Sequence, residues 1–144
     1  MNLTTKIITP GNDVTDAQSV RRQVFQVEQK ISSHADFDGL DSQLTHIVVY
    51  DDNIPVGTTR IKLLENNTLA KIERLSVLAS YRGKHIGVTI MKAVDDYLRK
   101  TNIKIITLDA QAYVKGFYER LGYKQEGEVF KEVGIPHVKM IKEL

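Results

Sequence analysis

The stretch from residue 68 to residue 108 constrains the fold more than any other part of this sequence. Residues 68–78 are typical of a buried strand, and a short turn that contains Gly83 follows. Residues 83–100 repeat apolar side chains at helical spacing, and residues 103–108 form a second, β-branched strand. Two strands joined by one helix make a βαβ unit. We therefore expect these strands to be parallel and the crossover between them to be right-handed.

The N-terminal segment predicts a strand followed by a long helix. Residues 3–9 are rich in β-forming side chains and stop at the turn pair Pro10-Gly11. Asp13 and Asp16 resemble a capping box at the start of an amphipathic helix of about 17 residues. The expected apolar face of this helix consists of Val14, Ala17, Val20, Val24, Val27 and Ile31.

The remaining segments complete a mixed sheet. The polar, acidic residues 32–43 predict a loop, and residues 112–121 predict a second helix that ends at Gly122. Further strands are expected at residues 44–50, 54–64, 123–131 and 137–142. Because the chain contains no linker or repeat, we expect residues 1–144 to form a single domain of the α/β class.

The strand at residues 68–78 changes its apolar phase. Ala70 and Ile72 carry the apolar side chains at even positions, whereas Leu75 and Val77 carry them at odd positions. A period of two residues changes phase only where a residue is inserted. The sequence therefore predicts a β-bulge at Glu73-Arg74, a feature that often lies beside functional sites.

The turn before the central helix predicts an anion site. Strand, turn and first helical turn would point several backbone N–H groups at one place, where the helix dipole also favours negative charge. Arg82 and Lys84 add two cations beside these groups. This arrangement is suited to a pyrophosphate.

Composition excludes several other classes of function. The chain has 144 residues and no cysteine, which excludes disulfides and thiolate chemistry and makes the cytoplasm the expected location. A net charge of +2, spread along the chain, does not indicate a nucleic-acid partner. No apolar run approaches a membrane span, and four scattered histidines do not predict a metal site.

Five fragments, in order, resemble one family. The chain resembles a GNAT-superfamily N-acetyltransferase of the small bacterial branch typified by ElaA and YjcF. The fragments are Arg22 to Gln29, Asp38 to Asp41 followed by His46, Ile72 to Val77 with Tyr81 to Lys84, Ala110-Gln111 with Phe117 to Tyr123, and Gly134 to His137 with Met140. The resemblance implies about seven strands in a mixed sheet, with a central parallel pair splayed at the bulge and about three to four flanking helices.

The resemblance also implies acetyl-CoA as co-substrate and a set of residues that bind it. The loop departs from the family pattern at one position, since His85 stands where a glycine is usual. Its side chain would either crowd the phosphates or add a donor to them. The implied coenzyme-binding residues are Leu75, Ser76, Val77, Arg82, Gly83, Lys84, His85, Ile86, Gly87, Val88, Gln111 and Tyr118.

Two residues are predicted to carry the chemistry of amine attack on the thioester. Glu73, on the bulged strand, is the candidate base that deprotonates the amine, acting through water. The alternative role of Glu73 is that of a surface carboxylate paired with a neighbouring cation. Tyr118 is the candidate acid that protonates the departing thiolate, a role that the resemblance implies because Tyr118 matches the family's tyrosine position. Its alternative is packing against Val114 and Leu121, and the two roles are compatible because only the hydroxyl must reach out.

The acceptor-binding residues are predicted from the same resemblance. Glu28 and Gln29 end the first helix, where an acceptor would enter, and a solvated helix face is their alternative. His46 and His137 are the other candidates, each with a backbone carbonyl contact as the favoured alternative. Asp36, Asp38 and Asp41 are expected either to attract a cationic acceptor or, preferably, to keep a loop soluble.

Three functions remain open from the sequence. The first is acetyl transfer to a primary amine, for which a small-molecule acceptor is favoured and polyamine, amino sugar, amino acid, antibiotic and protein lysine all stay open. The oligomeric state is also open, and the resemblance points to a homodimer because dimers are frequent among relatives. The second is a CoA-binding sensor without turnover, in which His85 has weakened the coenzyme loop. The third, ranked lowest, is an acyl-homoserine-lactone-synthase-like enzyme, for which this chain is short.

Overall fold

The structure is a computed structural model that describes residues 1–144, apart from the side chains of residues 34 and 35. Its seven strands lie in one mixed sheet in the order β1-β2-β3-β4-β5-β7-β6, with β4 and β5 parallel. The predicted α/β fold with a mixed sheet and a parallel pair is confirmed. The strands are β1 Leu3–Ile8, β2 Thr45–Asp51, β3 Ile54–Leu64, β4 Leu69–Val77, β5 Ile105–Gln111, β6 Lys124–Glu132 and β7 Ile135–Glu143.

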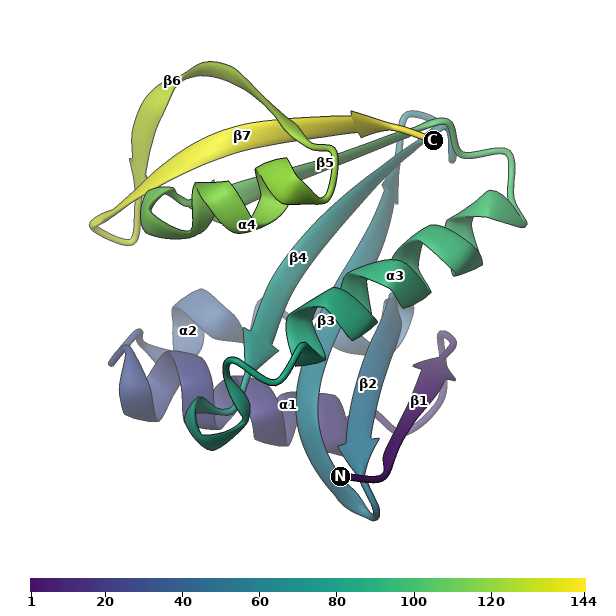
Figure 1. Ribbon diagram of the computed structural model, residues 1–144, viewed down its shortest axis with the longest axis vertical. Helices are drawn as coiled ribbons and strands as arrows, with labels where there is room; N and C mark the ends of the chain where they lie inside the picture. Colours follow the sequence, from purple (N-terminus) through teal and green to yellow (C-terminus); the bar gives the residue numbers. More distant parts are fainter. The chain divides into compact units, whose positions relative to one another are not determined.

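Helical segments connect these strands (Figure 1). They are α1 Thr15–Arg21, η1 Arg22–Glu28, α2 Ser33–Asp36, η2 Asp41–Gln43, η3 Ala79–Tyr81, α3 Ile86–Arg99, η4 Ala112–Val114 and α4 Lys115–Arg120. Within the described residues, none of these helices has the length and apolar character needed to cross a membrane.

The chain divides into two compact units. The first unit contains Met1–Ile61 and Arg74–Tyr97, and the second contains Lys62–Glu73 and Leu98–Leu144. The division falls within β3, β4 and α3. The single domain expected from the sequence stays a prediction, and the two units are described separately below.

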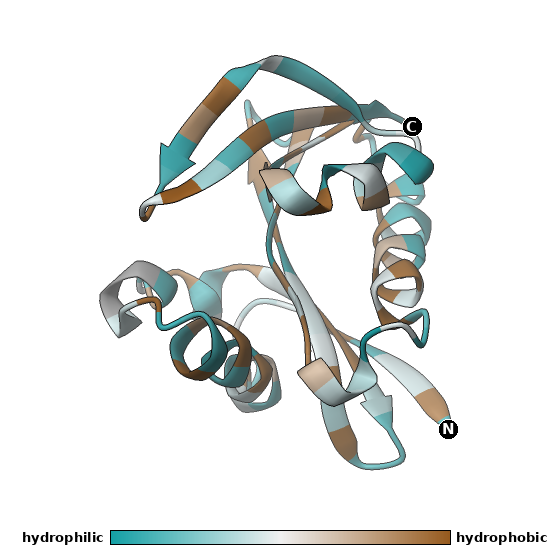
Figure 2. Ribbon diagram, turned by 60° about the vertical axis from the view of Figure 1, so that its left-hand side comes forward, coloured by the Kyte–Doolittle hydropathy of each residue, from teal (hydrophilic) through white to brown (hydrophobic). Residues whose placement is uncertain are grey.

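The first unit places helices on both faces of its strands. Figures 1 and 2 show α1 and α3 on opposite sides of β2 and β3. Ile86, Ile90 and Val94 of α3 are each 1% exposed or less. Burying an isoleucine or valine side chain of this kind stabilises a fold by about 1.5–3 kcal/mol. The amphipathic pattern read from the sequence therefore fixes α3, and with it the turn that precedes the helix.

The first predicted helix differs from the structure in two respects. Residues 22–28 continue α1 as a π-helix, so the wider turn moves Val27 off the apolar stripe, and this side chain is 68% exposed. The predicted capping box is also wrong. Asp13 instead accepts hydrogen bonds from the N–H and hydroxyl of Thr15, at 2.9 and 2.5 Å, and Asp16 accepts one from the hydroxyl of Tyr50.

The expected loop at residues 32–43 is more ordered and less exposed than its acidity suggested. It contains α2 and η2, and Asp36 and Asp41 are only 3% and 7% exposed. The prediction that its aspartates keep a loop soluble is therefore wrong for these two residues. Their carboxylates pair with buried arginines instead.

The second unit contains the parallel pairing of Leu69–Ile72 with β5, the antiparallel strands β6 and β7, and α4 beside them (Figure 1). β7 pairs with both β5 and β6. Gly122 has a φ of 96° and closes α4, as predicted, because its N–H donates to the carbonyl of Glu119 and the N–H of Tyr123 donates to that of Tyr118, both at 3.1 Å. This pair of bonds is a Schellman motif. It fixes the end of the helix that carries Tyr118.

Candidate active site

The backbone of β4 enters the left-handed region at Arg74, inside the dipeptide where the sequence predicted a β-bulge, and we call this position the bulge. The predicted change of phase is not seen in the buried side chains, because Ala70, Ile72 and Ser76 all occupy even positions. The parallel ladder pairs Leu69–Ile72 with residues 105–108 of β5, and β4 then continues through Arg74, whose φ is 56°. A residue in this left-handed region redirects a strand. Glu73, the candidate base, is half-buried and directly precedes the bulged residue.

Beyond the bulge, β4 carries the predicted pantetheine-binding backbone. Ser76 is the buried side chain of this segment, and its hydroxyl donates to the carbonyl of Arg74 at 3.3 Å. Leu75 and Val77 are half-buried. The N–H of Leu78 donates to the carbonyl of Val56 at 2.9 Å and ties the end of this segment to β3.

The turn from β4 into α3 is the segment where the sequence predicted an anion site. Gly83 and His85 both have left-handed backbones, with φ values of 75° and 63°. The first hydrogen bond of α3 runs from the N–H of Thr89 to the carbonyl of His85, at 3.0 Å. The N–H groups of Ile86, Gly87 and Val88 therefore lie in the first turn, before any donor that has an intrahelical partner. The helix dipole makes these groups favourable anion ligands.

The backbone conformation of His85 explains why glycine is usual at this position, because its φ of 63° lies in the left-handed region. A left-handed backbone costs a side chain with a Cβ about 1–2 kcal/mol relative to the right-handed form. The residue is exposed, and the hydroxyl of Thr89 donates to its carbonyl at 2.9 Å. Histidine in place of the usual glycine therefore strains the backbone at residue 85. Its exposed imidazole lies beside the first turn of α3.

Gly57 seats α3 on β3, a role that sequence reasoning missed. A Cβ at this position would lie 2.8 Å from the Cγ2 of Ile86 and 2.8 Å from the Cδ1 of Ile90. Only glycine permits this approach, which fixes the height of the first turn of α3. The available signal was a single glycine inside a strand, since such residues often mark a close approach.

Arg82 is engaged by Glu28 of η1. Its guanidinium donates to both carboxylate oxygens of Glu28, and its Nε and Nη2 donate to the carbonyl of Val77 at 3.2 and 3.0 Å. The hydrogen bond from Arg82 lowers the pKa of the Glu28 carboxyl below its usual value. A residue predicted for the acceptor and one predicted for the coenzyme are thus brought together as an exposed ion pair.

The second cation of the turn, Lys84, lies over an aromatic ring. Its Nζ is 5.3 Å from the ring centroid of Tyr81, and the hydroxyl of Tyr81 donates to Asp51 at 2.8 Å. This hydrogen bond raises the pKa of the Tyr81 phenol. Lys84 is exposed, so its charge is available close to the first turn of α3.

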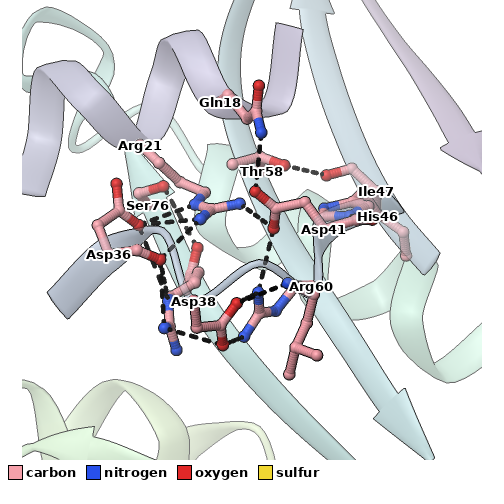
Figure 3. Close-up of polar contacts among 12 residues, drawn as sticks. Gln18, Arg21, Asp36, Asp38, Asp41, His46, Ile47, Thr58, Arg60 and Ser76 are labelled. Atoms are coloured by element: carbon pink, nitrogen blue, oxygen red, sulfur yellow. Dashed lines mark hydrogen bonds and ion pairs between the residues drawn. The ribbon is translucent and has the colours of Figure 1, made fainter. Parts of the chain in front are cut away.

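A buried set of ion pairs forms the other polar feature of the first unit (Figure 3). Arg21 and Arg60 are each 0% exposed. We call this set the arginine–aspartate network: Arg21, Asp36, Asp38, Asp41, Arg60 and Arg74. The sequence drew attention to the aspartates and missed both buried arginines. The missed signals were an arginine among the apolar positions of the first helix and another inside a buried strand.

Asp41 is the centre of the network. Its Oδ1 lies 2.7 Å from Arg21 Nη1 and 3.0 Å from Arg60 Nη1, and the amide of Gln18 donates to its Oδ2 at 2.9 Å. Although burial opposes it, these bonds lower the pKa of the Asp41 carboxyl. The carboxylate is charged and saturated with donors, which is how a buried charge is tolerated.

His46 lies inside the same region and is fully buried. Its Nε2 is 2.8 Å from the carbonyl of Asp41, the contact that the sequence favoured, and burial lowers the pKa of the imidazole. Within the described part of the chain, its Nδ1 has no hydrogen-bond partner. Because the side chain is 0% exposed, direct contact with an acceptor is not available to it. The prediction of His46 as an acceptor-binding residue is corrected accordingly.

In the second unit, Tyr118 packs among aromatic rings. Its ring meets Phe117 and Tyr123 edge to face, with centroids 5.0 and 5.9 Å away. Burial, with a smaller effect from Tyr113, raises the pKa of the Tyr118 phenol above its usual value. The buried phenol is therefore a weaker acid than an exposed tyrosine, and it keeps its proton near neutral pH.

His137 and Gln111 lie opposite each other on β7 and β5. The Nδ1 of His137 is 2.7 Å from the carbonyl of Ile135, which is the backbone contact favoured by the sequence. Its Nε2 lies 3.5 Å from a carboxylate oxygen of Glu132, and its ring stacks on Phe130. Both ring nitrogens therefore already have polar neighbours. Among the side chains that the structure describes, no group of three or more His, Asp or Glu forms a metal site.

Comparisons with known proteins place these features in one family. The sequence profile of the acetyltransferase (GNAT) domain matches residues 13–144. The chain is 36% identical over 129 residues to the "uncharacterized N-acetyltransferase YjcF" of Bacillus subtilis, covering 89% of this chain and 91% of that protein. It is similar to the crystal structure of Escherichia coli ElaA, with a TM-score of 0.86, 26% identity, and 98% and 99% of the two chains covered.

A further likeness concerns the fold alone. The PaiA N-acetyltransferase from Thermoplasma acidophilum, solved in complex with coenzyme A, has a TM-score of 0.78 at 17% identity, with 100% of both chains covered. The coenzyme in that crystal belongs to PaiA.

Proposed function

We propose that this chain transfers an acetyl group from acetyl-CoA to the primary amine of a small-molecule acceptor. The chain belongs to the GNAT acetyltransferase family and is an N-acetyltransferase. The observation that carries this proposal is the turn before α3. Two left-handed positions, Gly83 and His85, lead into a first turn whose N–H groups precede the first helical hydrogen bond. Such a turn suits the diphosphate of a coenzyme.

The residues of this turn fit coenzyme A. A Cβ built at Gly83 would meet no atom within 4 Å, so the backbone there is open to close approach. In the proposal, N–H groups of residues 83–88 hold the diphosphate and Lys84 adds a cation. Arg82 contributes only after its guanidinium leaves Glu28, because that pair occupies the fork that a phosphate would need.

The backbone of Leu75, Ser76 and Val77 is proposed to bind the pantetheine amides as an added strand would. The left-handed residue Arg74 supports this assignment, because it turns the strand just before these residues. One N–H of the segment would stabilise the oxyanion of the tetrahedral intermediate. A single donor of this kind contributes about 2.7–4 kcal/mol in other enzymes.

Two side chains are proposed to move protons. Acetyl-CoA supplies the acyl group and a thiolate leaving group. A free alkyl amine has a pKa near ~10 and must lose a proton before it attacks, so Glu73 acts as the base through water. Tyr118 donates to the departing sulfur, a role supported by the match of this residue to the family's tyrosine position.

The acceptor is proposed to meet Glu28, Gln29 and His137. Glu28 is exposed and carries a negative charge, which suits a cationic amine, although Arg82 neutralises it in this structure. The negative charge of Glu28 supports a primary amine as the chemical class of the acceptor.

A thiol-release assay tests the proposed function. Purified protein is mixed with acetyl-CoA and a panel of polyamines, amino sugars and amino acids, and free CoA is measured with a thiol reagent. At least one amine should accelerate release, and Tyr118→Phe should slow it without weakening CoA binding measured by calorimetry. Tight CoA binding with no release across the panel would favour the sensor function instead.

A further inference from the structure

The bulged residue Arg74 occupies a backbone conformation that favours glycine. Its φ of 56° lies in the left-handed region, which glycine adopts without the steric cost that a Cβ imposes. The backbone of the bulge therefore does not explain an arginine at this position. Its side chain offers an explanation.

The side chain of Arg74 reaches the last residue of α2 and the segment that follows it. Its Nε and Nη2 each donate to the carbonyl of Asp36, at 3.3 Å. Nη2 also lies 3.5 Å from Oδ2 of Asp38, and Nε lies 3.8 Å from Oδ1 of Asp36. The bulge is thus tied to a segment 36–38 residues earlier in the chain.

The two acceptors of Arg74 are held in turn by buried arginines (Figure 3). Arg21 binds Asp36 through Nε to Oδ1 and through Nη2 to the carbonyl, both at 3.0 Å. Arg60 binds both oxygens of Asp38, at 2.9 and 2.7 Å. Because Arg21 and Arg60 are 0% exposed, α1 and β3 fix the place of the acceptors.

Asp38 is the most accessible aspartate of this set, with a side chain 31% exposed. Hydrogen bonds from Arg60, supported by the charge of Arg74, lower the pKa of its carboxyl. It is therefore charged at neutral pH and shared between the buried Arg60 and the bulge. We call the contacts of Arg74 with Asp36 and Asp38 the tether. A substitution of Asp38 changes the tether with the smallest disturbance of the core.

We propose that Asp36 and Asp38 are positioning residues that hold the β4 bulge, through Arg74, in the shape required for acetyl transfer. The inference rests on the proposed function, in which Glu73 and the Leu75–Val77 backbone flank this bulge. A displacement of about 1 Å at such a segment is enough to lower a rate about 100-fold. The arginine–aspartate network thereby acts on catalysis without touching a substrate.

Three substitutions separate the tether from the backbone of the bulge. Arg74→Gly suits the left-handed backbone and removes the tether. Arg74→Lys keeps a cation but loses the guanidinium fork, and Asp38→Asn weakens the charge that the fork meets. Ile8→Val is the matched control, because it removes one methyl group from the core cluster of Ile8, Ala17 and Val48, which contains no residue of the network.

The measurements are backbone hydrogen exchange of residues 73–77, kcat, and CoA affinity by calorimetry. Arg74→Gly should accelerate exchange about tenfold and lower kcat about 100-fold, while CoA affinity changes less than about threefold. Arg74→Lys should retain part of kcat, and Asp38→Asn should lie between them. Ile8→Val should lower the melting temperature with kcat and exchange at residues 73–77 unchanged.

Two results would overturn the proposal. One is unchanged exchange at residues 73–77 in both Arg74→Gly and Asp38→Asn. The other is a kcat loss in these variants no larger than the loss in Ile8→Val. If the unmodified protein transfers acetyl groups to no amine, the proposed function fails, and the exchange experiment alone decides whether the network holds the bulge.

Discussion

Two sets of arginine–carboxylate pairs in the first unit differ in burial. Arg21 and Arg60 are fully buried, whereas the side chains of Arg82 and Glu28 are 45% and 38% exposed. Removing one partner of a buried pair leaves an uncompensated charge and costs about 3–5 kcal/mol, whereas an exposed pair contributes about 0–1 kcal/mol. Pairs of a guanidinium and a carboxylate therefore stabilise the fold where they are buried, around Arg21 and Arg60. The exposed pair of Arg82 and Glu28 can separate and bind other partners.

The exchangeable pair is the one beside the proposed coenzyme turn. Displacement of the Glu28 carboxylate from Arg82 by a diphosphate costs little free energy, because both side chains are already solvated. The buried network has no such freedom. Substitutions in the network should therefore change stability far more than substitutions in the exposed pair.

Arg21→Leu should lower the free energy of unfolding by about 3–5 kcal/mol, because it removes the fully buried cation that pairs with the carboxylates of Asp36 and Asp41. Urea denaturation measures this change. Arg82→Leu is the matched exposed variant and should cost less than about 1 kcal/mol. Equal losses in the two variants would remove the distinction between the pairs.

Tyr118→Phe should lower kcat by about 100-fold while leaving stability nearly unchanged, because the buried ring is kept and only the donor is lost. Steady-state kinetics and thermal unfolding measure the two quantities. This variant separates chemistry from stability, which Arg21→Leu does not. A kcat equal to that of the unmodified protein would exclude Tyr118 as the acid.

Acid should destabilise the chain partly through the network. The folded-state pKa of Asp38 is lowered, so its contribution to stability is present above the unfolded pKa near ~3.9 and is lost as pH falls toward the folded value. Asp38→Asn should flatten the dependence of unfolding free energy on pH below about 4, by an amount on the order of 1 kcal/mol. Glu28→Gln should flatten it less, because solvent screens that pair. Urea denaturation at a series of pH values measures both slopes.

His85→Gly should stabilise the chain by up to about 1 kcal/mol, since it relieves the left-handed backbone, offset by the greater freedom of glycine when unfolded. Thermal unfolding checks this value. CoA affinity should rise in the same variant if the imidazole crowds the phosphates. Weaker binding would show instead that His85 donates to them.

Glu28→Gln should tighten CoA binding by about two- to fivefold, because Arg82 is released from its charged partner. Calorimetry measures the affinity. The control is Glu126→Gln, which removes an exposed carboxylate that lies 3.4 Å from Lys139. Binding that weakens in Glu28→Gln would mean that the pair orients Arg82 toward the coenzyme rather than competing with it.

Local patterns predicted the coenzyme turn and the bulge. Gly83 and the helical spacing of Ile86 and Ile90 are properties of neighbouring residues, and the structure places the turn and α3 where they indicated. The apolar phase after Ile72 led to the irregular residue Arg74, but the buried side chains of β4 stay on even positions through Ser76. Ordered motifs predicted the GNAT family, which the comparisons confirm.

Contacts between distant segments were not predictable in the same way. Arg21 and Arg60 meet Asp41 across 20 and 19 positions of the chain, and no local pattern announces such a pair. The prediction that Val27 is buried was wrong because a π-helical turn changes the angular spacing that it assumed. The role of Gly57 depends on side chains of α3, which a strand pattern does not contain.

Backbone amide NMR during a titration with coenzyme A would decide whether the turn before α3 holds the diphosphate. The amides of residues 83–88 should show the largest shift changes, followed by those of residues 75–77, and the changes should saturate with one coenzyme per chain. Saturating changes confined to other residues, with the turn before α3 unaffected, would contradict the assignment of that turn as the diphosphate site.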